Sequence, residues 1–295
     1  MRYQRQALVV LTQFMVLSQA LAVVDAAEDV EKHLLQYKFQ MGEVLRYGVN
    51  HSTNIRTTIE ATTQEAESQS ESIKAWKVTD VLPNGEIEFV HVVEQVRMSN
   101  RVPNRALRKF DSELDKEPPP GFEQAAGAVG IPLSVIRIRP SGEVTNRKEK
   151  HPQPAPSKDL PMMPVLPEEP MAVGEEWSFI YDIEVSRQDG TKQKVRTRRV
   201  CTLEQVKAGV ATFTAEYQIL TPVSAAIESQ LIDRQTQGKV RFDIERGRII
   251  SQKFDADRRV IGFSGDASSM HFVSRMEERL LKPEERLASN PKDAK

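Results

Sequence analysis

The chain has 295 residues, and its 41 basic and 42 acidic side chains give a formal net charge of −1 at pH 7. A near-neutral chain has no overall field to attract nucleic acid, so nucleic acid is not expected as a partner. Aromatic residues make up only 6% of the chain, which disfavours a carbohydrate-binding face lined with Trp and Tyr. The single cysteine, Cys201, cannot form an intramolecular disulfide and is expected to be a small buried residue on a strand.

Residues 1–26 have the composition of a secretory signal peptide. Arg2 and Arg5 give a basic start, a mostly apolar run covers 7–24, and Ala20-Leu21-Ala22 offers a small-residue cleavage site. Polar residues interrupt the apolar run, which disfavours the alternative of an N-terminal membrane anchor. No later stretch is long and apolar enough to span a membrane. We therefore expect an exported protein, periplasmic or extracellular, with N-terminal anchoring as the alternative.

The first half of the mature chain, 27–150, shows the two-residue periodicity of β-strands. Apolar and polar residues alternate over 35–41 and again over 45–49. A Thr-rich stretch at 52–63 has high β-propensity but few apolar side chains, so it is expected to be an exposed strand. The polar stretch 64–72 is expected to be a loop or a hairpin tip.

A hairpin is predicted next, because Asn84-Gly85 tolerates positive φ between the strand-like stretches 73–81 and 86–98. After this turn, alternation places four residues on one face: Ile87, Phe89, His91 and Val93. The alanine-rich stretch 122–129 predicts one short helix, limited by its glycines. A strand is expected over 133–139.

Residues 151–170 contain seven prolines, so they are expected to be extended and to connect two halves. The alternative is an extended segment laid over the sheet. The second half, 171–281, again alternates, and 270–281 fits either a strand or a helix face. The tail at 282–295 is polar and expected to fray. Strands are predicted over 178–185, 192–201, 211–219, 240–244 and 250–257.

The second half repeats a pattern of the first. The runs at 42–47 and 174–179 both read glycine, acid, any residue, apolar, polar, aromatic. Phe89 follows the glycine of one predicted turn by four residues, and Phe213 follows the glycine of another by four. Repeated strands and glycine turns predict a mainly β fold, with antiparallel sheets in two pseudo-repeated halves and at most one or two short helices. We expect the halves to form one continuous unit.

Three stretches carry a resemblance to a known pattern. Residues 166–177 combine prolines with the step Val173-Gly174-Glu175-Glu176-Trp177, and 242–249 and 76–89 supply further strand-and-glycine signals. Together they resemble an uncharacterised, planctomycete-type family of exported bacterial β-rich proteins, over most of the mature chain. The resemblance implies export and a β-rich fold. It implies no established activity, so it assigns no catalytic residue.

No motif for catalysis or metal binding is recognised. The five histidines do not have metal-ligand spacing. His91, whose counterpart in the second half is Ala215, is expected in the core or at its rim. The chain lacks the G-x-S-x-G, G-x-G-x-x-G and P-loop motifs, and Asp255-Ala256-Asp257 is only a fragment of a calcium loop. We therefore predict no catalytic, cofactor-binding or metal-binding residues and no cofactor.

The strongest local charge feature is the basic stretch from Lys192 to Arg199. Four of its side chains project from one side of a predicted strand: Lys192, Lys194, Arg196 and Arg198. They form either a solvated strand face that discourages edge pairing or a patch for an anionic cell-envelope partner. The neutral overall charge favours the solvated face.

These observations predict an exported, non-enzymatic binding or structural β module of the cell envelope, with an apolar or anionic ligand as its possible partner. The alternative is a secreted or periplasmic hydrolase that uses carboxylates scattered through the chain. A smooth apolar concavity would favour the binding module. A deep polar cleft with two facing carboxylates would favour the hydrolase.

Overall fold

Antiparallel β-strands make up most of the chain, as predicted. The computed structural model describes residues 31–152, 162–187 and 189–287. The predicted signal peptide, most of the polar tail and residues 153–161 of the proline-rich stretch lie outside them. The described helices are short: α1 (Glu123–Gly127), α2 (Ala225–Gln230) and the 3-10 turn η1 (Ile232–Arg234).

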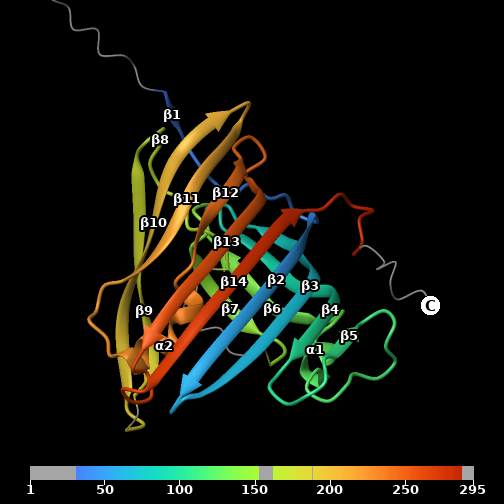
Figure 1. Ribbon diagram of the computed structural model, residues 1–295. Coiled ribbons are helices and arrows are strands. Elements are labelled where there is room, and N and C mark those ends of the chain that lie inside the picture. Colours follow the sequence, from blue (N-terminus) through green and yellow to red (C-terminus); the bar gives the residue numbers. More distant parts are fainter. Residues whose placement is uncertain (1–30, 153–161, 188, 288–295) are drawn as a thin grey trace, which may run out of the picture. The chain divides into compact units, whose positions relative to one another are not determined.

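One sheet contains 12 strands (Figure 1). Its order is β7 (Val144–Glu149), β6 (Pro132–Ile138), β4 (Ile87–Arg101), β3 (Thr62–Val81), β2 (Val44–Ile59), β14 (Ser268–Leu280), β13 (Arg248–Ile261), β12 (Gln237–Asp243), β11 (Val210–Ile219), β10 (Lys192–Lys207) and β9 (Glu176–Ser186), and β5 (Arg108–Asp111) also pairs with β4. A separate two-stranded sheet joins β1 (Lys32–His33) and β8 (Met171–Ala172).

The last strand, β14, lies in the middle of the large sheet, between β13 and β2 (Figure 1). Its register with β2 runs from Ser268 opposite Ile59 to Leu280 opposite Tyr47. Residues 270–281, which fitted a strand or a helix, are therefore almost entirely strand. Because β14 pairs with both neighbours, the hydrogen-bonded sheet continues from residues of the predicted first half into those of the second.

The two runs that were aligned from the sequence, 42–47 and 174–179, make matching backbone contacts. Gly42 donates its N–H to the Val78 carbonyl at 3.1 Å, and Gly174 donates to the Leu203 carbonyl at 2.7 Å. Val78 and Leu203 each donate back to the carbonyl of the acidic residue that follows the glycine, at 2.9 and 3.0 Å. The same pair of backbone hydrogen bonds therefore forms at Gly42 and at Gly174. That the two halves arose by duplication stays a prediction.

The main hydrophobic core covers one face of the large sheet, which we call the inner face; the opposite face is the outer face. Phe89 and Phe213 are both fully buried there. The same core cluster contains Ile136 of β6, next to one edge strand, and Leu203 of β10, next to the other. Residues from both halves therefore share one core.

An extended N-terminal segment fills part of this core. Leu35, Tyr37 and Phe39 are buried, as their alternation suggested. The prediction that 35–41 forms a strand was wrong. The Tyr37 N–H donates to the Pro140 carbonyl at 2.7 Å, and the next N–H donates to the Gly247 carbonyl at 3.0 Å. Alternate burial requires an extended backbone, and here two turns supply its hydrogen-bond partners instead of a neighbouring strand.

The two turns approach this segment so closely that each needs glycine. A Cβ at Gly142 would lie 2.5 Å from a ring carbon of Tyr37. A Cβ at Gly247 would lie 2.4 Å from the backbone nitrogen of Lys38. Any other residue at either turn would push the segment out of the core.

The described end of the proline-rich stretch also packs into the core. Met163 and Leu166 are buried in the main cluster. The Leu166 N–H donates to the Ser141 carbonyl at 2.8 Å, and the Trp177 indole N–H donates to the Val165 carbonyl at 2.9 Å. Residues 162–170 therefore match the alternative of an extended segment laid against the sheet.

The expected loop at 64–72 was wrong, because these residues belong to β3. The hairpin turn instead lies at Glu60 and Ala61, whose φ angles are +47° and +65°. Neither residue is a usual signal for positive φ. The polar side chains of 64–72 face solvent on a strand whose backbone is paired with β2, and from Glu67 onward with β4 as well.

Truncating Phe213 should test the shared core. We expect Phe213→Ala to lower the free energy of unfolding by about 3–5 kcal/mol, because a fully buried ring is lost and a cavity remains. The control is Ile180→Ala on β9, where the side chain is 48% exposed and the loss should stay within about 1 kcal/mol. Chemical denaturation measures both. A Phe213→Ala loss below about 1 kcal/mol would contradict this core assignment.

Candidate functional site

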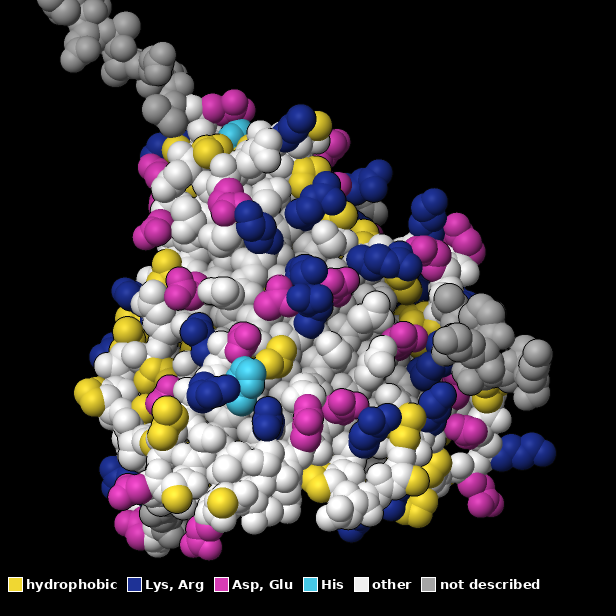
Figure 2. Space-filling model, viewed as in Figure 1, with side chains coloured by type: hydrophobic (Ala, Val, Ile, Leu, Met, Phe, Trp, Pro, Cys, Tyr) yellow, Lys and Arg dark blue, Asp and Glu magenta, His cyan; other side chains and the backbone are white. Residues whose placement is uncertain are grey.

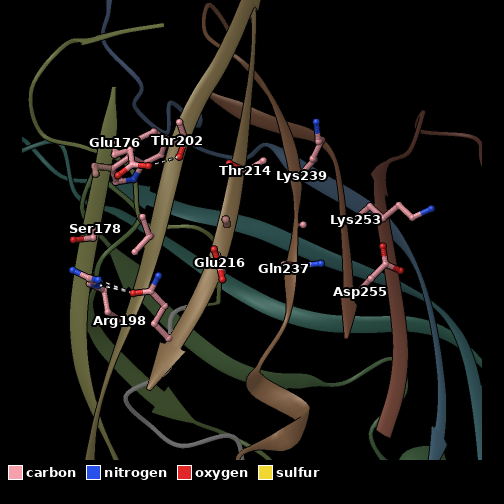
Figure 3. Close-up of a pocket in the computed structure, with 15 residues that line it drawn as sticks. Glu176, Ser178, Arg198, Thr202, Thr214, Glu216, Gln237, Lys239, Lys253 and Asp255 are labelled. Atoms are coloured by element: carbon pink, nitrogen blue, oxygen red, sulfur yellow. Dashed lines mark hydrogen bonds between the residues drawn. The ribbon is translucent and has the colours of Figure 1, made fainter. Parts of the chain in front are cut away.

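A wide trough lies on the outer face across β9 to β13 (Figure 3). Its volume is about 850 Å³. The strand alternation that turns Cys201 and Phe213 inward turns their neighbours Thr202 and Thr214 outward, toward the trough. Because polar and charged side chains dominate the lining, the trough is not an apolar concavity.

Most charged groups of the trough already have protein partners. Other strands of the same sheet supply these partners, which is typical of a solvated sheet face. Figure 2 likewise shows basic and acidic side chains interspersed over the face of the sheet toward the viewer. The pairs are Glu176 with Thr202 at 3.2 Å, Arg198 with Gln218 at 2.6 Å, Lys239 with Glu204 at 2.7 Å, Lys253 with Glu277 at 2.8 Å, and Asp255 with Arg275 at 2.8 Å.

The predicted basic stripe lies on the outer face of β10. Its members are Lys192, Lys194, Arg196 and Arg198. Carboxylates of β9 lie beside it: Glu184 is opposite Lys194 in the strand register and also binds Lys192, and Asp182 is opposite Arg196. These carboxylates lower the positive potential of the stripe, which favours a solvated face. An anionic partner at the stripe stays a hypothesis.

Two of the three carboxylates that line the trough, Glu216 and Asp255, lie on either side of β12. Glu216 is opposite Gln237, and Gln237 is opposite Asp255 (Figure 3). Two strand spacings separate the α-carbons of Glu216 and Asp255 by about 10 Å. Glu216 is exposed, and Asp255 accepts a hydrogen bond from Arg275. Both carboxylates therefore lie on a solvated face rather than at the bottom of a deep polar cleft.

A second hollow, of about 300 Å³, lies on the inner face. Side chains from β2, β9, β10, β13 and β14 line it together with residues 162–164 and η1. Methionine predominates among its large apolar side chains, and methionine adapts its shape to irregular ligands. The large apolar lining residues are Met162, Met163, Phe179, Phe254 and Met276. We call this hollow the inner cavity.

Six polar residues share the lining of the inner cavity with its apolar side chains. His51 Nε2 lies 2.9 Å from Ser274 Oγ, and both side chains line the cavity with Gln252 and Asp233. Gln252 and Ser274 are buried, whereas His51 and Asp233 are exposed. The exposed pair therefore marks the side on which the cavity opens.

Arg199 is the basic residue of the inner cavity. Its guanidinium carbon lies 5.7 Å from the ring centroid of Tyr217 and 5.5 Å from that of Phe254. Its Nη1 donates to the hydroxyl of Thr236 at 3.2 Å. Both distances are within the range of cation–π attraction.

A buried ion pair lies next to the cavity. Lys74 Nζ is 2.5 Å from a carboxylate oxygen of Glu278, and the Glu278 residue is only 4% exposed. The same ammonium lies 5.0 Å from the ring of Trp76. Gln252 of the cavity is opposite Glu278 in the β13–β14 register.

His91 lies in the core, as expected, with a ring nitrogen, Nδ1, that lacks a hydrogen-bond partner among the described residues. Burial lowers its pKa to about 4, and the positive charges of Lys74 and Arg147 add to the decrease. The imidazole is therefore neutral in the folded protein at neutral pH. Among the described residues, no group of three or more His, Cys, Asp or Glu side chains is placed to hold a metal ion.

This histidine should make stability depend on pH. The unfolded chain protonates His91 near its ordinary pKa of about 6.5, whereas the folded chain does so only near pH 4. Between these values the unfolded state binds more protons, so stability falls as the pH decreases. The free energy of unfolding of the parent should fall by about 2–3 kcal/mol between pH 7 and about 4.5. We expect His91→Leu to abolish this decrease.

The measurement is urea denaturation across this pH range. His271→Leu is the control, because that side chain lies on the outer face of β14 and not in the core, and the loss of stability on acidification should persist in this variant. Equal pH dependence in the parent and in His91→Leu would contradict the assignment.

The sequence did not single out the residues of the inner cavity. Arg199 could have been found, because alternation places it with Val195 and Cys201 on the inner side of β10, opposite the basic stripe. Met162, Met276 and Phe254 could not, since they come from distant parts of the chain. No described helix has both the length and the apolar character required to cross a membrane.

No protein-family model and no curated protein matches the chain. Two solved structures are distantly similar. The first, described as "Lipid-protein interactions in lipovitellin", is 13% identical, with a TM-score of 0.44; the match covers 86% of this chain but only 26% of the lipovitellin chain. The second, DynF from the dynemicin biosynthesis pathway of Micromonospora chersina, is 8% identical, with a TM-score of 0.22 and coverage of 90% and 92%. Similarity at this level assigns no function.

Proposed function

We propose that this protein is a non-enzymatic binding module that holds a small amphipathic molecule in the inner cavity. The observation that carries the proposal is the lining of that cavity, where five large apolar side chains share the wall with polar side chains. Small-molecule sites in proteins have this composition, and they bury most of the ligand surface.

The size of the cavity favours a ligand with a single apolar chain. About 300 Å³ is at the lower end of the volumes found for small-molecule sites. Met162, Met163 and Met276 supply flexible side chains that can adjust to a chain of variable length. By contrast, most side chains that line the outer trough are polar or charged, and Trp177 is the large apolar residue among them.

Binding should depend on the apolar wall. A neutral fluorescent probe, N-phenyl-1-naphthylamine, should bind the full chain, and decanol should displace it. Met276→Lys puts an ammonium into the wall and should weaken probe binding by at least about tenfold. Val273→Lys is the control, because it makes the same change on the outer face of the same strand and should leave binding unchanged.

Both variants are first compared with the parent by thermal unfolding, so that weaker binding is not confused with loss of the fold. Equal weakening by both lysine substitutions, or no saturable probe binding to the parent, would contradict the proposed function.

We further propose that the chain is exported and belongs to the planctomycete-type exported family that it resembles. The basic start, apolar run and small-residue site within 1–26 support export. N-terminal sequencing of protein from the native host should find a mature end near Val23 or Ala27. An intact Met1 on a product in the cytoplasm would refute export, and an intact Met1 in the membrane fraction would indicate the anchored alternative.

A further inference from the structure

Arg199 has an unusual position in the strand that carries it. The other basic side chains of this stretch point outward along β10, whereas Arg199 points inward with Val195 and Cys201. Val195 and Cys201 are both buried. Arg199 itself is half-buried, so its guanidinium loses part of its hydration, and hydrogen-bond acceptors or an opposite charge must compensate for that loss.

The protein supplies only part of this compensation. Nη1 donates to the carbonyl and hydroxyl oxygens of Thr236, at 3.4 and 3.2 Å, and the Tyr181 hydroxyl also interacts with the guanidinium. A guanidinium has more N–H donors than these contacts use. Within residues 31–152, 162–187 and 189–287, no carboxylate lies within 4.0 Å of Arg199.

The contrast with Lys74 indicates what is missing. Lys74 also points to the inner face, and there it has Glu278 as a buried counter-ion. Arg199 lies at the wall of an open cavity without one. Two aromatic rings lie near its guanidinium, and the fork of N–H donors suits a planar or tetrahedral anion that accepts two parallel hydrogen bonds.

Resting on the proposed binding function, we infer that the ligand is an amphipathic anion, and that Arg199 binds its carboxylate or phosphate head group. Phe254 connects the two parts of the site, because its ring stacks on the guanidinium and also lines the cavity. An anion at Arg199 would therefore have its apolar chain directly against Phe254, with Met276 farther along the same lining.

The test compares three ligands with the same ten-carbon chain and different head groups: decanoate, decanol and decyltrimethylammonium. Each displaces N-phenyl-1-naphthylamine from the full chain below its micellar concentration. Decanoate should bind roughly tenfold more tightly than decanol, because a charge-assisted hydrogen bond adds to the apolar contacts. The cationic ligand should bind most weakly.

Arg199→Gln should remove the preference for decanoate and leave decanol binding unchanged. Arg198→Gln is the matched control: it removes the same charge one residue away, on the outer face, where Arg198 binds Gln218. It should leave all three affinities unchanged. If Arg199→Gln proves unstable in thermal unfolding, Arg199→Lys replaces it, and it should weaken decanoate binding while retaining a preference over decanol.

The outcomes separate the two proposals. Equal binding of decanoate and decanol by the parent would overturn the inferred anion and leave the binding function intact. Failure of all three ligands and of the probe would overturn both. Dioctanoyl phosphatidylglycerol, decyl phosphate and decanoate distinguish the source of the head group. Binding of the diacyl lipid that is tighter than that of both single-chain ligands supports a membrane phosphate. Tighter binding of decyl phosphate or decanoate supports a free single-chain anion.

Discussion

Burial of the extended segment at 35–39 is the constraint on which the rest of the structure depends. The inner face of the large sheet is apolar, and the 12 strands do not cover it by themselves. Leu35, Tyr37 and Phe39 fill it from within, and backbone hydrogen bonds fix the segment to turns at Pro140 and Gly247. These turns belong to different parts of the sheet, so a single short segment sets the spacing between them.

Two positive charges of the inner face, Lys74 and Arg199, have different surroundings. Lys74 has a buried carboxylate partner, and its ammonium lies over aromatic rings. Separating such a pair leaves an uncompensated buried charge, which costs several kcal/mol, so this pair fixes the arrangement of β3 against β14. Arg199 has aromatic neighbours but no carboxylate partner among the described residues. Lys74 therefore stabilises the packing of the strands, whereas Arg199 is available to bind a ligand.

The alternation of apolar and polar residues in the sequence identified individual strands and turns. It found the strands around 179–185 and 211–219, and Asn84-Gly85 marked a hairpin turn. It could not distinguish a strand from a buried extended segment at 35–41, because both bury every second side chain. It also could not place Met162, Phe254 and Met276 around one cavity. That proximity arises only from the order of strands in the sheet, which the sequence of one chain does not encode in any short pattern.

The position of β14 has a consequence for the order in which the molecule can assemble. Tyr47 pairs with Leu280, so the middle of the sheet cannot close until two strands that are distant in the sequence have come together. Contacts between such distant residues slow folding and prolong the lifetime of unpaired strands. The open edge of β2 is then a hazard for association with other chains. Its distal half, from Asn50 to Thr58, is rich in hydroxyl and amide side chains, a composition that limits hydrophobic self-association until β14 pairs with it.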